Sequence, residues 1–287
     1  MDASQAVSTL AFLWLISLMF RMGLSVSIRS VLDSLAHIRF LLSGVLANFI
    51  FVPLVAYGLL AYFQPEPMVS FGFLIVGVFS GAPFGPAFAT IAKGDTSLAI
   101  GLMIFLAGLS VPISPAVLAF LLGYLPGSSP ITLDHASILK VMLVGQLAPL
   151  CAGLAVGAIP GSLRVIIARP TKVVSQVLMF GACSGILITE ANTLREFGPK
   201  AYMGMLAVFA SSMTIGWLLG GPGVVRRKTM MFVTTIRNSA AALAIVSTNY
   251  AGTEATAAAL AYTLFFSVGA FIAALVMGRR SDAYVSQ

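Results

Sequence analysis

The chain has 287 residues, of which 59% are hydrophobic and only 9% are charged, and its mean hydropathy is +1.01. Since a soluble domain carries about 25% charged residues, this composition excludes an ordinary soluble protein and predicts one embedded in the lipid bilayer. The formal net charge of +7 does not indicate a nucleic-acid partner, because the basic residues stand in short connections between apolar segments.

Nine apolar segments follow one another along the chain. Each has about the 20 residues that a helix needs to cross the hydrocarbon core of a bilayer. The segments are residues 7–26, 38–62, 68–92, 97–123, 138–160, 170–191, 200–220, 228–250 and 255–278. We therefore predict an all-α polytopic membrane protein with nine transmembrane helices, which form a single membrane domain over residues 1–287.

The basic residues are distributed unequally between alternate connections. One set, with the C-terminal tail, holds Arg21, Arg29, Arg39, Lys93, Arg164, Arg169, Lys172, Arg226, Arg227, Lys228, Arg279 and Arg280. The other set holds only Lys140, Arg195 and Lys200. Because cytoplasmic loops are rich in Lys and Arg, this predicts an odd number of spans, with the N-terminus outside and the C-terminus inside. The compact size favours a bacterial inner (plasma) membrane.

The third segment does not read as a simple helix. Gly81, Pro83, Gly85 and Pro86 lie within six residues of each other. Proline removes a backbone donor and clashes with the preceding turn, so these residues predict a helix break. Broken backbone at membrane depth is tolerated where it is buried in protein or lines a watery cavity. A kink that serves only packing is the alternative.

The eighth segment contains a charge, Arg237, in the stretch TTIRNSAAALAI. Arg237 comes nine residues after Lys228, which places it roughly 14 Å deep in a core about 30 Å thick. A charge at that depth is costly and marks a functional site, whereas snorkelling to the cytoplasmic side is the alternative. Thr234 and Asn238, four residues apart on one helical face, either bind a ligand with Arg237 or join helices through hydrogen bonds.

The two unusual segments occupy corresponding places in two halves of the chain. The third and the eighth segments are each followed by one further span, as expected of a transporter with inverted repeats and broken helices at its substrate site. We therefore predict a first repeat over residues 7–124, with four spans, and a second over residues 138–278, with five. The first repeat lacks its first helix.

Four stretches carry a resemblance to a known family. They are MFRMGLSVS from Met19, NFIFVPLVAY from Asn48, SGAPFGPAFATIAKGD from Ser80 and TTIRNSAAALAI from Thr234. In this order and spacing, from about Leu10 to Met277, the chain resembles the bile acid:sodium symporter family.

The resemblance implies a panel domain and a core domain. The panel would comprise the spans within 7–26 and 138–191, and the core those within 38–123 and 200–278. The third and eighth spans would cross as broken helices in the core. The substrate would bind between the domains, whose relative movement would alternate access.

The chain departs from the family at the sodium ligands. Gly85 and Pro86 stand where the resemblance implies Ser and Asn ligands, and Val233 stands in place of an acidic ligand. Met103 and Ala107 fall about where hydroxyl ligands are implied in the fourth span. Most of the oxygens that sodium requires are therefore missing, and we expect neither a cofactor nor a metal site.

Arginine replaces a glutamine of the family at the second break. Arg237 stands at that position, its neighbour Asn238 is kept, and Asn48 replaces a glutamine of the second span. We hypothesise that the guanidinium, which has five donors and stays protonated, takes the place of a sodium ion and binds carbonyls freed at the breaks. The candidate ion- and substrate-binding residues are Asn48, Gly85, Pro86, Thr234, Thr235, Arg237, Asn238 and Ser239.

These features predict a secondary transporter of small organic anions, either bile-acid-like or simple carboxylates and sulfonates. A sodium-coupled symporter with a non-standard ion site is an alternative, as is a channel. A carrier of arsenic or antimony oxyanions would be expected to use a cysteine in the broken span, and Cys151 and Cys183 lie elsewhere.

Two other classes of protein fit less well. An enzyme is not expected, because His37 and His135 stand in or beside loops and no catalytic motif appears. A membrane receptor or sensor without transport would carry a cytoplasmic output element, and we expect none in the nine residues after Gly278.

Overall fold

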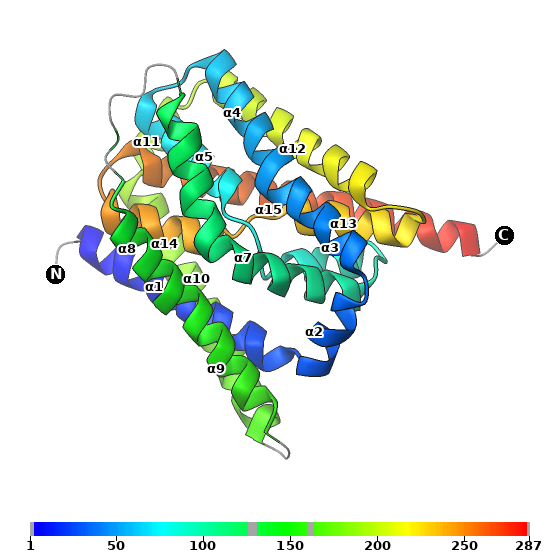
Figure 1. Ribbon diagram of the computed structural model, residues 1–287. Helices are drawn as coiled ribbons and strands as arrows, with labels where there is room; N and C mark the ends of the chain where they lie inside the picture. The colour runs from blue at the N-terminus through cyan, green and yellow to red at the C-terminus, as the bar shows by residue number, and fades with distance from the viewer. Residues whose placement is uncertain (1–2, 126–130, 132, 160–162, 286–287) are drawn as a thin grey trace.

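The computed structural model of the chain describes residues 3–125, 131, 133–159 and 163–285. Every regular element within these residues is a helix, and Figure 1 shows their arrangement. In chain order the elements are α1 (Ala3–Ser25), α2 (Ile28–Leu35), α3 (Ile38–Leu46), η1 (Ala47–Phe51), α4 (Val52–Phe63), α5 (Pro67–Val78), α6 (Gly85–Ile91), α7 (Thr96–Gly123), α8 (His135–Lys140), η2 (Val141–Leu147), α9 (Ala148–Gly157), α10 (Leu163–Thr189), α11 (Ala191–Glu196), α12 (Pro199–Leu219), α13 (Val224–Thr235), α14 (Ser239–Asn249) and α15 (Glu254–Val285).

Eight helical segments in the described ranges are long and apolar enough to cross a membrane. They are Gln5–Ser25, Ile38–Phe63, Thr96–Gly123, His135–Gly157, Ile166–Thr189, Pro199–Leu219, Val224–Asn249 and Glu254–Arg279. They coincide with eight of the nine predicted spans, so the all-helical membrane fold is confirmed. The remaining span, 68–92, is divided into α5 with 12 residues and α6 with seven, and each is shorter than the core of a bilayer.

Two of the long helices contain a π-helical turn ahead of a proline. η1 joins α3 to α4 just before Pro53, and η2 joins α8 to α9 just before Pro149. Proline clashes with the carbonyl of the preceding turn, and a local widening of the helix accommodates the clash. Such turns often occur at functional sites.

Several helices extend beyond the predicted segments, and two short helices were not predicted. α10 begins at Leu163 and contains Pro170, which was predicted to open that span. The connections on either side of the predicted spans also hold two short helices, α2 and α11. The length of an apolar segment predicts where a span crosses the membrane, but it does not predict how far the helix continues beyond the apolar residues.

Helix α1 packs chiefly against α9 and α10, and the three helices lie together on one side of the molecule (Figure 1). Glycine permits the closest part of this contact. A Cβ atom added at Gly23 would stand 2.1 Å from the carbonyl oxygen of Leu150, and one at Gly153 would stand 2.1 Å from that of Phe20. Close backbone approach through small residues is a usual way for membrane helices to associate.

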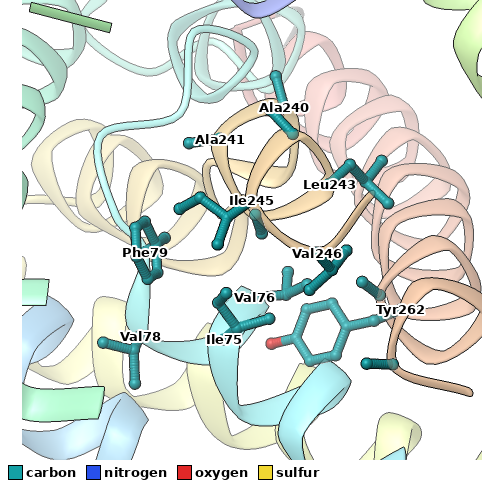
Figure 2. Packing of buried hydrophobic residues seen from close by; sticks show 14 of the residues in the cluster. Ile75, Val76, Val78, Phe79, Ala240, Ala241, Leu243, Ile245, Val246 and Tyr262 are labelled. Carbon is teal, nitrogen blue, oxygen red and sulfur yellow. The ribbon is translucent and has the colours of Figure 1, made fainter. Parts of the chain in front are cut away.

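A buried apolar cluster fixes α14 against α5. Ile75 and Val76 of α5, with Phe79 just after it, lie on the side of α14 that carries Ile245 and Val246, as Figure 2 shows. Every residue of α14 from Ala240 to Ser247 is buried. This packing places the start of α14 beside the end of α5, where both membrane segments are interrupted.

Candidate functional site

The two interrupted segments meet at their breaks. α5 ends at Val78 and α6 begins at Gly85, whereas α13 ends at Thr235 and α14 begins at Ser239. The residue after each helix is extended, with ψ of 111° at Phe79 and 119° at Ile236. The backbone N–H of Asn238 donates to the carbonyl oxygen of Phe79 at 2.9 Å. A hydrogen bond therefore joins the two breaks directly.

The first break depends on its glycine and proline residues. Gly81 has φ of 80°, and a Cβ atom there would lie 2.4 Å from the backbone of Ala107 in α7. Only glycine satisfies both conditions without strain. Pro83 also lies in the interruption, whereas Gly85 and Pro86 open α6, where the missing N–H of proline costs no helical hydrogen bond.

The second break forms without proline or glycine. Asn238 caps α14, because its side-chain oxygen accepts a hydrogen bond from the N–H of Ala241 at 3.3 Å. Asparagine at this position favours the start of a new helix over continuation of the old one. Arg237 therefore lies in a non-helical turn between two helices rather than within one helix.

The guanidinium of Arg237 is hydrogen-bonded to neutral groups. Nη1 donates to Oδ1 of Asn48 at 2.6 Å and to the carbonyl oxygen of Thr234 at 3.4 Å. Nη2 donates to the carbonyl oxygen of Asn48 at 3.1 Å. Arg237 is 3% exposed, and its Nε has no hydrogen-bond partner among the described residues. The side chain thus reaches a π-helical turn of another helix and does not snorkel.

No carboxylate balances this charge within the part of the chain that the structure describes. Arg237 follows the C-terminal end of α13, where the helix dipole and the last carbonyl groups favour a cation. The amide of Asn48 is held in turn, since its Nδ2 donates to the carbonyl oxygen of Gly44 at 2.9 Å and to Oγ1 of Thr234 at 3.3 Å. The site therefore holds a net positive charge among oriented dipoles.

Asn238 takes part in a separate series of hydrogen bonds that does not include Arg237. Its Nδ2 donates to Oε1 of Gln146 at 2.7 Å, and Nε2 of Gln146 donates to the carbonyl oxygen of Ala107 at 2.7 Å. Gln146 lies in η2 and is fully buried. The π-helical turn η1 therefore presents Asn48 to Arg237, and η2 presents Gln146 to Asn238.

Thr234 and Asn238 do not share the one helical face that their spacing predicts, and each is hydrogen-bonded to another helix. The helix ends between them, so Thr234 contacts Asn48 while Asn238 contacts Gln146. Thr235 donates back to the carbonyl oxygen of Met231 at 2.7 Å, and Ser239 to that of Arg237 at 3.4 Å. The Thr235 hydroxyl is thus bonded within its own helix, and the Ser239 hydroxyl is bonded to the backbone of the second break.

The positions compared with sodium ligands lie next to each other. A Cβ atom added at Gly85 would lie 3.1 Å from Cα and 3.6 Å from Cγ2 of Val233. Val233 is fully buried, and Pro86 is buried beside it in α6. Gly85 and Val233 therefore lie close together and neither offers a side-chain oxygen. The described residues contain no group of three or more His, Cys, Asp or Glu side chains that would hold a metal ion.

A cavity of about 280 Å³ adjoins the second break. It is lined by Arg237, Asn238 and Ser239 from the break and by Pro83 and Phe84 from the other interruption. The remaining walls are Trp14 and Leu18 of α1, Met179, Phe180 and Cys183 of α10, and Ile236, Ala240, Thr263, Leu264 and Ser267. The cavity thus lies between the side of the molecule formed by α1 and α10 and the two interrupted segments.

Gln146 and Ser80 were not among the predicted site residues. Gln146 is an amide in an apolar span three residues before a proline, and this combination was a usable signal. Ser80 lies in the first break, is fully buried, and its hydroxyl has no hydrogen-bond partner among the described residues. The two cysteines, Cys151 and Cys183, are both free thiols, and Cys183 of α10 lines the cavity beside the second break.

Comparison with known proteins identifies the family. Residues 12–196 match the model of the sodium bile acid symporter family, which covers the first interruption and ends before α12. A search of curated proteins found no match. Members of the matched family are transporters and not enzymes. Since the match spans more than half of the chain, the protein belongs to the sodium bile acid symporter family.

Proposed function

We propose that this protein is a secondary transporter of small organic anions that works by alternating access and needs no sodium. The observation that carries the proposal is the guanidinium of Arg237, which lies buried at the crossing of two broken segments with no carboxylate bonded to it in the described structure. A fixed cation in a site of low dielectric attracts an anion strongly. It also makes an exchangeable cation at the same place unnecessary.

The proposed architecture has nine crossings in two inverted repeats, 7–124 and 138–278. The segment Pro67–Ile91 counts as the ninth crossing, because α5 and α6 follow one another across the break. The spans within 7–26 and 138–191 form the panel, and those within 38–123 and 200–278 form the core. The packing of α1 against α9 and α10 supports this division.

Helix termini at the breaks favour an anionic substrate. α14 starts at Ser239, and the residues that cap and open it line the cavity of about 280 Å³. The N-terminal end of a helix carries a partial positive charge, and broken helices of transporters point such ends at anionic groups. We therefore place the substrate carboxylate or sulfonate beside Arg237 and Asn238, with its apolar part against Leu18 and Phe180.

The loss of sodium coupling follows from the ligands. Sodium needs several oxygen atoms, and Gly85 and Val233 present none from their side chains. A Cβ atom added at Gly85 would lie 3.1 Å from Cα of Val233, so the two backbones approach closely and a side-chain ligand at position 85 has little room. A sodium site elsewhere in the protein would contradict this part of the proposal.

Uptake into proteoliposomes tests the proposal. Labelled taurocholate, a short dicarboxylate and a short sulfonate would be offered in sodium and in choline buffers to the native protein, Arg237→Lys and Arg237→Gln. We expect at least one anion to enter equally well in both buffers. Arg237→Gln should lower its uptake by about tenfold or more, whereas Arg237→Lys, which keeps the charge, should retain part of it.

Two results would overturn the proposal. Uptake that strictly requires sodium would show that an ion site remains, and uptake by Arg237→Gln equal to that of the native protein would show that the charge does not bind substrate. Arg195→Gln, at an exposed position of α11, is the matched control and should transport normally. Elution as a single species in size-exclusion chromatography would verify that each variant is folded.

A further inference from the structure

A second and larger cavity lies away from the breaks, inside a ring of four helices. α4 contacts α12 and α5, and α15 contacts α5 and α12, so the four helices enclose a common space (Figure 1). The cavity measures about 520 Å³ and shares no lining residue with the one beside Arg237. We call it the α4–α12 cup. Its volume lies within the range of about 300–1,000 Å³ that is usual for small-molecule sites.

The wall of the cup is apolar and rich in aromatic rings. Phe63 of α4, Phe73 of α5, Phe197 before α12 and Tyr262 of α15 all line it. Ala56, Leu59, Leu60, Val69, Ala201, Met205 and Val208 complete the wall. Tyr262 comes eight residues after the start of α15 at Glu254, which places it roughly 12 Å below that end of the helix. The cup is thus deep enough for an elongated apolar molecule.

The mouth of the cup carries three charged side chains. Glu66 precedes α5, Glu196 ends α11 and Lys200 opens α12, and all three are exposed. Two carboxylates against one ammonium group give the mouth a net negative charge. This sign is opposite to that of the site at Arg237.

We propose that the α4–α12 cup binds an amphiphilic organic ammonium compound. Its alkyl part would lie against the aromatic wall, and this contact would remove apolar surface from water. Its ammonium group would stay at the mouth near Glu66 and Glu196, where aromatic faces such as that of Phe63 also attract a cation. The site is independent of the transport proposal, because its ligand and the transported anion carry opposite charges.

Binding of decyltrimethylammonium tests this site. Isothermal titration calorimetry would be done on the full-length protein in a neutral maltoside detergent, with decanoate as the matched anionic probe. We expect saturable 1:1 binding of the ammonium compound that is at least tenfold tighter than binding of decanoate. The double variant Glu66→Gln/Glu196→Gln should weaken binding of the ammonium compound about tenfold, because it removes both carboxylates.

Two further variants test where the ammonium compound binds and whether the site prefers a positive charge. Gly204 lines the cup and a Cβ atom there lies 3.7 Å from the ring of Phe63, so Gly204→Trp should fill the cup and abolish binding. Lys200→Gln removes the like charge and should tighten binding severalfold, a gain that misfolding cannot produce. Glu190→Gln, outside the cup, should leave affinity unchanged. Equal binding of decanoate, or no response to Lys200→Gln and Gly204→Trp, would overturn the proposal.

Discussion

The charge of Arg237 is stabilised by its position rather than by a counter-ion. A charged side chain in the middle of a membrane helix costs at least about 2.5 to 3.5 kcal/mol, even in the most lenient measurements. Here the end of α13, two carbonyl oxygens and the amide of Asn48 receive the guanidinium. These groups are already oriented by the fold, so they stabilise the cation without neutralising it.

Replacement of Asn48 by aspartate tests whether the net charge matters. Asn48→Asp would keep an oxygen beside Nη1 and convert the hydrogen bond into an ion pair. We expect the thermal stability to be maintained or raised, while uptake of the anion falls about tenfold because the site becomes neutral. The measurement is uptake into proteoliposomes beside a thermal melt of the same preparation.

The matched control for this change is Asn249→Asp. Asn249 is an asparagine at the far end of α14, where it accepts a hydrogen bond from Ser137, and it does not contact Arg237. Its uptake should stay normal. If Asn48→Asp also transports normally, then the positive charge of Arg237 has a structural role only.

At the scale of elements, the two interruptions have different causes. The first is imposed by the backbone, since Gly81 has positive φ and lies against Ala107. The second is imposed by side-chain capping, since Asn238 starts α14 and also bonds to Gln146. The π-helical turns η1 and η2 each bring an amide to this second break. Four separate elements therefore have to be in place before the site exists.

Gly81→Ala should destabilise the protein strongly. Its Cβ would collide with the backbone of α7 and require a strained φ, at a combined cost of about 2 to 6 kcal/mol. We expect a much lower melting temperature and little folded protein after extraction in detergent. Gly108→Ala is the matched control, because a Cβ at Gly108 meets no atom within 4 Å.

An equal melting temperature for the two glycine variants would contradict this view of the first break. It would mean that the loop from Phe79 to Phe84 shifts easily away from α7. The hydrogen bond between Asn238 and Phe79 would then not hold the two breaks in one fixed arrangement.

At the scale of the whole molecule, α1, α9 and α10 lie together on one side, and α4 and α12 lie on the opposite side (Figure 1). The start of α1 and the end of α15 point to opposite ends of the molecule in the same view. This arrangement agrees with an odd number of crossings.

Cysteine labelling tests the predicted orientation. In a background with Cys151→Ala and Cys183→Ala, single cysteines at Gln64 and Glu254 should react with a membrane-impermeant maleimide on intact cells. Cysteines at Arg39 and Arg169 should react only after the cells are permeabilised. All four positions are exposed, so labelling reports the side of the membrane rather than burial.

The reverse labelling pattern would invert the topology, and labelling of Gln64 and Arg39 from the same side would show that Ile38–Phe63 does not cross the membrane. The reverse pattern would also contradict the rule that basic residues remain in the cytoplasm. Gln64 and Arg39 stand at the two ends of the single span Ile38–Phe63, so this pair gives the clearest comparison.

The sequence by itself determined the membrane fold, the approximate span positions and the place of Arg237. These depend on local properties, since about 20 apolar residues suffice for a span and Gly81 and Pro83 suffice for a break. The break at Arg237 was expected only from the resemblance to the family and not from local residues, because an asparagine cap competes with helix continuation only weakly unless its partners are present.

Only the tertiary structure decided which groups meet. Asn48 and Arg237 are separated by 189 residues, and Asn238 and Gln146 by 92, yet each pair is hydrogen-bonded. The two cavities likewise arise from helices far apart in sequence. Hydrophobicity places a helix in the membrane but does not determine which helix it packs against, because lipid is as apolar as the helices themselves. Close packing and hydrogen bonds determine which helices associate.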